Sequence, residues 1–168
     1  MQNTISLREQ IPALTLRTPD GRTVSAWDFK QKRNRVIALL RADSPGTWEF
    51  VNQIAAHAED WKQKEAIGLV VFSKPPAAGM PKNLPPEIIT GTDASGRSIV
   101  RYLGTEALGP GGLLRQGVFV ADRYGELYAQ WIVEKDGELP RMSAILKALE
   151  QVEVACEECQ VSVWPIEG

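Results

Sequence analysis

The two thiols are the groups best suited to chemistry in this chain, and they lie close together near its C-terminal end. Cys156 and Cys159 form a Cys-x-x-Cys pair, and no cysteine precedes them. This spacing is used by redox pairs and also supplies half of a zinc site. Glu153, Glu157 and Glu158 surround the pair with negative charge, and the end of the predicted last helix adds the negative pole of its dipole. Both effects should raise the pKa of the thiols and make them poor nucleophiles.

Three hypotheses for the pair follow from its residues. The first is an inert or structural pair, either reduced or joined in a disulfide that locks the tail. The second is a metal site shared with other ligands, because two thiolates do not complete a structural zinc site. The third is a cycle between dithiol and disulfide. We favour the first.

A second polar group is the segment Asp-Ser-Pro-Gly-Thr-Trp at residues 43–48. The hydroxyls of Ser44 and Thr47 could act as nucleophiles only with a base to activate them. The single histidine, His57, lies about three helical turns further on, and we expect it to be a partly buried structural residue. Turn formation and helix capping, with Thr47 as N-cap, is therefore the favoured role. Asp43 is either a solvated capping residue or a buried acid.

A buried strand and a long helix are predicted to flank this segment. Val36–Leu40 is an unbroken apolar run rich in branched residues, which is typical of a strand buried on both faces. Pro45 and Gly46 end the strand. From Thr47 to Trp61 apolar residues recur at helical spacing. Ile67–Phe72 is a second buried strand at the distance that a right-handed βαβ unit requires.

The rest of the chain predicts further strands and helices around this unit. In order, they are a hairpin of Ile11–Arg17 and Arg22–Ser25, a helical turn at Ala26–Gln31, a proline-rich loop at Ser73–Glu87, a short strand at Ile88–Ile89, a helix at Arg97–Leu103, a flexible loop at Gly109–Gly112, a hairpin of Gln116–Ala121 and Glu126–Val133, and a helix at Ser143–Val154. This order predicts an α/β protein with a mixed sheet flanked by helices.

Composition narrows the class of protein. The 168 residues suit one domain, which we place at residues 1–153, with a tail at 154–168. The net charge of −2 gives no electrostatic reason for binding nucleic acid or a membrane surface. No apolar segment approaches the roughly 20 residues needed to span a bilayer, and the N-terminus lacks the apolar core of a secretory signal. We therefore expect a cytoplasmic protein, and no motif predicts a cofactor.

Four segments in order resemble the peroxiredoxins, the alkyl hydroperoxide reductase/thiol-specific antioxidant branch of thioredoxin-fold proteins. They are I-P-A-L-T-L-R-T-P-D-G-R-T-V-S-A-W-D-F at 11–29, R-V-I-A-L-L at 35–40, G-T-D-A-S-G-R-S-I-V-R-Y-L-G at 91–104 and L-L-R-Q-G-V-F-V-A-D-R-Y-G-E-L at 113–127. The resemblance implies a thioredoxin-like fold with an N-terminal β-hairpin and an active site at the start of the long helix. It also implies that Arg115 lies close to the arginine that holds the reactive thiolate.

The chain departs from the family at that site. The resemblance aligns either Ser44-Pro45-Gly46-Thr47 with the Cys-x-x-Cys of thioredoxins or Trp48 with the peroxidatic cysteine. Trp48 in that place would block substrate access. Arg115 either holds a small anion near the helix N-terminus or forms a salt bridge at a strand end. No thiolate is available at the helix start, and a hydroxyl does not replace it.

These observations predict a degenerate member of an antioxidant oxidoreductase family, without a peroxidatic site. Its role would be binding or redox-linked assistance, with a protein partner of unknown identity or a second copy of the chain. The alternatives are a thiol-disulfide oxidoreductase that uses Cys156 and Cys159, and a metal-binding module at the same pair.

Overall fold

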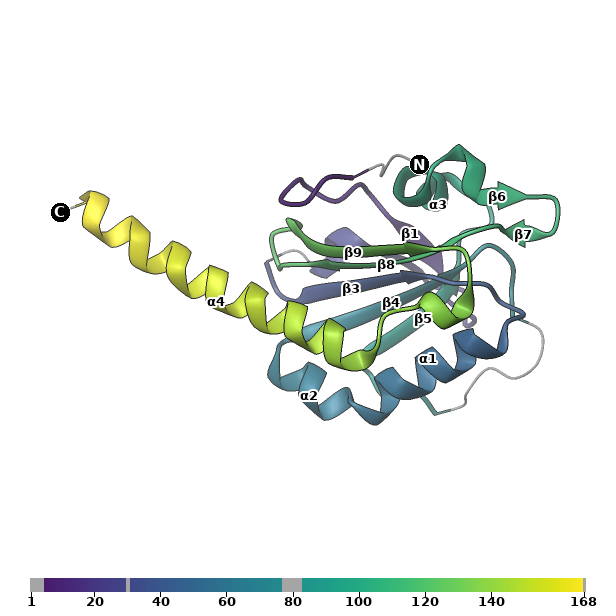
Figure 1. The fold of residues 1–168 in the computed structure, drawn as a ribbon, viewed down its shortest axis with the longest axis horizontal. Helices are drawn as coiled ribbons and strands as arrows, with labels where there is room; N and C mark the ends of the chain where they lie inside the picture. Colours follow the sequence, from purple (N-terminus) through teal and green to yellow (C-terminus); the bar gives the residue numbers. More distant parts are fainter. Residues whose placement is uncertain (1–4, 30, 77–82, 168) are drawn as a thin grey trace.

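The architecture is a seven-stranded mixed sheet with helices on both faces (Figure 1). The computed structural model describes residues 5–29, 31–76 and 83–167, with side chains to residue 155 except that of Asp136. The strand order is β2-β1-β5-β4-β3-β8-β9. β3, β4 and β5 are parallel, while β8 and β9 continue the sheet antiparallel on one side and β1 and β2 on the other. The predicted fold class is confirmed.

The centre of the sheet consists of the strands that the apolar runs predicted. β3 (Asn34–Leu39) lies between β4 (Ala66–Phe72) and β8 (Gln116–Ala121), and every residue of the three strands is buried. Alternate side chains of β3 supply two separate cores, since neighbouring residues of a strand point to opposite faces. Ile37 and Leu39 enter the core on one face, and Val36 and Ala38 enter the core on the other.

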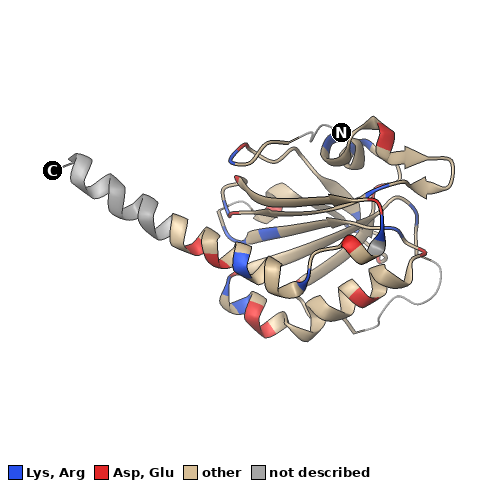
Figure 2. Ribbon diagram, viewed as in Figure 1, with Lys and Arg blue, Asp and Glu red and all other residues tan. Residues whose placement is uncertain are grey.

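Helices cover the two faces unequally (Figure 1). α1 (Pro45–Ala56), α2 (Ala58–Gln63) and the start of α4 (Met142–Glu167) pack on the face of Val36. α3 (Arg97–Leu103) and the short η1 (Ala26–Phe29) and η2 (Thr105–Ala107) contribute to the other face. α2 and α4 carry acidic and basic residues together (Figure 2). Within the described residues, no helix combines the length and apolar character that crossing a bilayer demands.

Short strands complete the edges of the sheet. The N-terminal hairpin is β1 (Thr15–Arg17) with β2 (Thr23–Ser25), and Arg17 pairs with Thr92 of β5 (Ile88–Thr92). The other edge is β9 (Leu127–Val133), the partner of β8. The predicted flexible loop at Gly109–Gly112 is instead the turn of a small hairpin, β6 (Leu108–Gly109) with β7 (Gly112–Leu113). η3 (Asp136–Glu138) precedes α4.

The long helix differs from its prediction at both ends. It starts at Pro45 rather than Thr47, because Ser44 adopts the extended N-cap conformation and proline is suited to the first helical position. It also ends at Ala56, and a separate α2 carries Trp61. His57 lies at the break, where its Nδ1 donates to the Gln53 carbonyl at 2.9 Å. A side chain that donates to a backbone carbonyl of a helix competes with the backbone amide that would otherwise bond to that carbonyl.

The C-terminal helix is longer than predicted. It was expected to end at Val154, but it continues to Glu167 through the proposed start of a tail at residue 154. No glycine or proline lies between Val154 and Trp164, so this stretch lacks the residues that usually stop a helix. The domain limits stay a prediction. The side chains of Cys156 and Cys159 are outside the described part of the structure. Part of the Ser73–Glu87 loop, residues 77–82, is also outside the described residues.

Candidate functional site

The start of α1 lies at the carboxyl end of β3, where the sequence placed the candidate site. The 43–48 segment turns directly into the helix, and the Thr47 amide donates to the Ser44 carbonyl at 3.1 Å. Asp43 and Pro45 are exposed, whereas Ser44 and Thr47 are buried. Asp43 is therefore a solvated residue and not a buried acid. It is also not the N-cap, because the backbone of Ser44 holds that position.

Thr47 connects the helix start to the strand before it. Its hydroxyl donates to the Arg41 carbonyl at 2.6 Å and lies 3.5 Å from Oε1 of Gln116. The same Gln116 oxygen accepts the Arg41 amide at 2.9 Å. The expected capping bond from Thr47 is absent because its side chain points toward the end of β3, so its hydroxyl is a structural donor.

Arg41 joins three segments of the chain at this point. Its Nε donates to the Leu113 carbonyl at 3.0 Å, and its Nη2 donates to the carbonyls of Leu114 and Glu134 at 2.7 and 2.8 Å. Each bond carries the charge of the guanidinium, which makes such bonds stronger than neutral ones. The segment before β8, the end of β9 and the start of α1 are therefore fixed relative to one another.

Substituting Thr47 should separate the role of the hydroxyl from that of side-chain volume. Thr47→Val keeps the size but leaves the Arg41 carbonyl without this donor, so we expect a loss of about 2 kcal/mol in the free energy of unfolding. Thr47→Ser keeps the hydroxyl and removes one methyl, which should cost less than about 1 kcal/mol. Urea unfolding of both variants measures the difference. A serine variant less stable than the valine variant would contradict this account.

A serine-type mechanism has no geometric support in this site. His57 lies at the opposite end of α1 from Ser44, about 20 Å away at 1.5 Å per residue. Its Nδ1 is occupied by the Gln53 carbonyl within the same helix. A base must reach the hydroxyl within hydrogen-bond distance, directly or through one water. His57 is half-buried at the helix break, as its spacing predicted.

Arg115 contacts α3 and η2. It is buried, its Nη1 donates to the Leu103 carbonyl at 3.3 Å, and its Nη2 lies 3.5 Å from Oε2 of Glu106. These contacts agree with the salt-bridge alternative for this residue. The Nε of Arg115 is buried and has no hydrogen-bond partner among the described residues.

Trp48 packs against the sheet. Its ring is half-buried, with its centroid 5.7 Å from that of Phe72 on β4 and the planes tilted at 58°. It contributes to the core beneath α1. Packing is thus one role of this large residue at the helix start.

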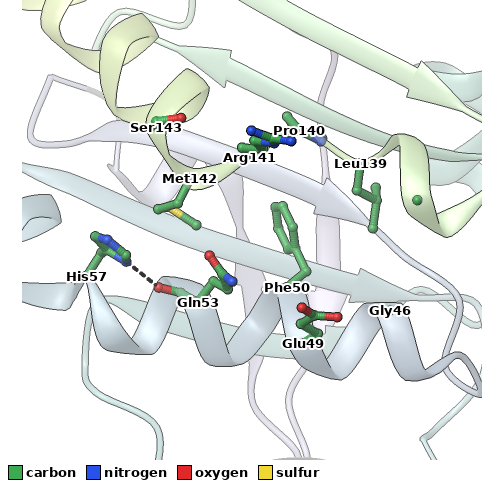
Figure 3. A pocket seen from close by; sticks show the side chains of 11 residues that line it. Gly46, Glu49, Phe50, Gln53, His57, Leu139, Pro140, Arg141, Met142 and Ser143 are labelled. Atoms are coloured by element: carbon green, nitrogen blue, oxygen red, sulfur yellow. Dashed lines mark hydrogen bonds between the residues drawn. The ribbon is translucent and has the colours of Figure 1, made fainter.

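A groove lies along α1 next to the 43–48 segment (Figure 3). Its volume is about 570 Å³, within the range of small-molecule sites. Gly46, Glu49, Phe50, Gln53 and His57 of the α1 side line one wall, and Gly137, Leu139, Pro140, Arg141, Met142 and Ser143 line the other. Phe50 and Met142 are buried, whereas Glu49 and Arg141 are exposed. The groove therefore offers apolar surface between charged rims. No local sequence pattern indicates this groove, because its walls come from distant segments.

No group of three or more potential metal ligands occurs among the described residues. Elsewhere, burial raises the pKa of Tyr128 on β9 to about 12, while the nearby Arg8 guanidinium acts in the opposite direction.

No protein-family model and no curated protein matches this sequence. Solved structures match its fold. Reduced 2-Cys peroxiredoxin from Plasmodium vivax superposes with a TM-score of 0.72 at 11% identity over 90% of this chain and 83% of the other. A peroxiredoxin-like protein from Aquifex aeolicus gives a TM-score of 0.67 at 17% identity over 88% of each chain. A putative thiol:disulfide interchange protein DsbE from Chlorobium tepidum gives 0.61 at 16% identity over 90% and 97%.

The chain has a thioredoxin-like fold. At these identities the likeness concerns the fold alone. Within the thioredoxin-like fold of this chain, the start of α1 holds Ser44, Thr47 and Trp48, and the first 155 residues contain no cysteine. Two residues that hold this region, Arg41 and Gln116, were not candidates from the sequence. Their position was the only signal, since Arg41 closely follows β3 and Gln116 is the first residue of β8.

Proposed function

We propose that this chain is a degenerate peroxiredoxin-like protein without thiol peroxidase chemistry at α1, and that it acts by binding. The observation that carries the proposal is the use of the Thr47 hydroxyl inside the protein, in a segment with no thiol. Peroxide reduction needs a thiolate nucleophile. A buried hydroxyl that donates to a backbone carbonyl does not supply one.

The groove beside α1 supports the binding part of the proposal. Its volume, apolar floor and charged rims suit a small molecule with an apolar body and polar ends. The wider role is accessory and redox-linked, with another protein or a second copy of the chain as partner.

Peroxide consumption with a thioredoxin-type reductant tests the proposal. We expect no turnover above the rate of the reductant alone, because the helix start has no group that attacks the peroxide oxygen. An ordinary peroxiredoxin in the same assay is the positive control. The Cys156→Ser/Cys159→Ser variant should give the same background rate as the unaltered chain.

Turnover has a distinct meaning for each variant. Robust turnover that disappears in Cys156→Ser would overturn the proposal in favour of a redox enzyme at the C-terminal pair. Turnover that persists without both thiols would overturn it in favour of chemistry at another group. Metal that co-purifies in half-molar amounts, and is lost in the double variant, would assign the pair to a shared metal site.

A further inference from the structure

A second hollow lies near the β2-β1 edge of the sheet. It has a volume of about 360 Å³ and is formed by β1, β2, the end of β5 and the start of α3. β1 and β5 are separated from β3 by β4 in the strand order, so this hollow is distinct from the helix start described above. Arg17, Arg97 and Arg101 line it.

The elements around the hollow fix the backbone positions of these arginines. Arg17 pairs with Thr92 on β5 and with Thr23 on β2. Arg97 and Arg101 are four residues apart on α3, and this spacing places them on one face of the helix. Arg101 also donates from Nη1 to the Ala13 carbonyl at 3.4 Å.

The start of β1 is joined to α3 as well. The Thr15 amide donates to Oγ of Ser98 at 3.0 Å. The backbones of β1 and β5 also approach closely at Gly91, where a Cβ would lie 2.7 Å from the Arg17 carbonyl oxygen. The walls of the hollow are therefore mutually anchored.

The three arginines have no carboxylate partner within ion-pair distance among the described residues. Four arginines elsewhere in the chain do have such a partner: Arg8, Arg22, Arg115 and Arg123 each lie within 4.0 Å of a carboxylate oxygen. Clustered like charges repel one another, and a bound anion removes that repulsion.

The one carboxylate that lines the hollow already accepts hydrogen bonds from within the protein. Asp93 is buried, its Oδ2 accepts the amides of Ser98 and Ile99 at 3.0 and 3.1 Å, and its Oδ1 accepts the Ser95 hydroxyl at 2.9 Å. It therefore caps the start of α3 and also uses the amides that an anion could otherwise contact. Any ligand must be held by side chains instead.

Donors dominate the remaining polar groups. The arginines present only N–H donors. Thr15, Thr23 and Thr92 also line the hollow, and their hydroxyls have no hydrogen-bond partner among the described residues. A hollow with many donors and few free acceptors suits a ligand that carries several acceptor oxygens and negative charge.

We infer that this hollow binds the phosphate group of a small organic phosphate. Guanidinium groups match phosphate oxygens with paired, charge-assisted hydrogen bonds, and threonine hydroxyls donate to the same oxygens. The volume falls within the range of sites for whole small molecules, which leaves room for an organic part beside the phosphate. This inference is independent of the function proposed for the helix start.

Calorimetry and amide NMR with inorganic phosphate and glycerol phosphate test the inference at low ionic strength, with glycerol as the uncharged control. Both phosphates should bind saturably, glycerol should not, and glycerol phosphate should bind more tightly. Added salt should weaken binding. Chemical shift changes should centre on residues 92–98. An absence of saturable binding by either phosphate would overturn the inference, and so would shift changes located elsewhere. Inorganic phosphate binding as tightly as glycerol phosphate would overturn the inference that the hollow holds an organic part beside the phosphate.

Variants identify the groups responsible. Arg17→Gln, Arg97→Gln and Arg101→Gln should each weaken glycerol phosphate binding about tenfold, and the triple variant should abolish it. Arg97→Lys keeps the charge but loses the paired donors, so its affinity should be intermediate. Arg22→Gln is the matched control, because Arg22 is exposed, lies next to β2 and pairs with Asp20 outside the hollow. Equal binding by the triple variant and the unaltered chain would refute the site. All three residues are exposed, so the variants should fold normally.

Discussion

Arg35→Ala should lower the free energy of unfolding by about 4 kcal/mol. Arg35 lies in β3 and is fully buried, with Nη1 donating to the Ala26 carbonyl at 2.7 Å and Nη2 donating to the Asp122 carbonyl at 2.9 Å. Burial lowers the pKa of its guanidinium, while Tyr102 and Asp122 act in the opposite direction. Arginine remains charged at neutral pH. Alanine would remove both donors and leave a cavity where η1 meets the loop between β8 and β9.

Two further variants separate the contribution of the hydrogen-bond donors from that of side-chain volume and provide a surface control. Arg35→Met fills most of the volume without the donors, so it should recover part of the loss. Arg33→Ala is the surface control, since Arg33 is exposed two positions earlier and should change the unfolding free energy by less than about 0.5 kcal/mol. Urea unfolding followed by circular dichroism measures all three. A loss below about 1 kcal/mol for Arg35→Ala would show that the buried guanidinium does not hold these segments.

Trp61→Ala should cost a similar amount, about 4 kcal/mol, through a different mechanism. Trp61 is fully buried between α2 and the sheet, and its Nε1 has no hydrogen-bond partner among the described residues. Its ring fills the space above Gly68, where a Cβ would lie 2.9 Å from Cζ3 of Trp61. Removing the ring would open a large cavity in the core shared by α1, α2 and α4.

Gly68 provides a matched test of this packing. Gly68→Ala should cost about 2 kcal/mol because the new methyl meets the indole ring. In a Trp61→Phe background the smaller ring should leave room for the methyl group. The same Gly68→Ala substitution should then lower the free energy of unfolding by less than about 1 kcal/mol. Thermal and urea unfolding of the four proteins in this cycle measure the coupling. Strict additivity would rule out direct contact between the methyl and the ring as the cause.

The central strands were predictable because their signal is local and strong. Val36–Leu40 and Ile67–Phe72 are apolar at every position, so burial on both faces is the only arrangement that removes them from water. The Arg97–Leu103 helix was also predicted with its observed limits, since Gly104 supplies a stop signal. The βαβ order then restricts the topology around these strands.

The limits of the long helix were harder to predict because competing local signals act there. Both Ser44 and Thr47 are good N-cap residues, and the choice between them depends on what else each can bond. The carbonyl of Arg41 attracts the Thr47 hydroxyl, and this acceptor is positioned by the end of β3. The break at His57 likewise follows from a side-chain bond that periodicity does not reveal.

The sequence by itself determined the fold class and the absence of a thiol before residue 156, because strand-forming apolar runs and residue identity are properties of the chain alone. The tertiary structure decided which polar groups meet. Arg41 reaches carbonyls more than 70 residues away, and Arg17 shares a hollow with Arg97 and Arg101 only because β1 pairs with β5 beside α3. Such meetings depend on strand pairing between distant segments, and no local pattern of residues specifies which distant side chains will share a surface.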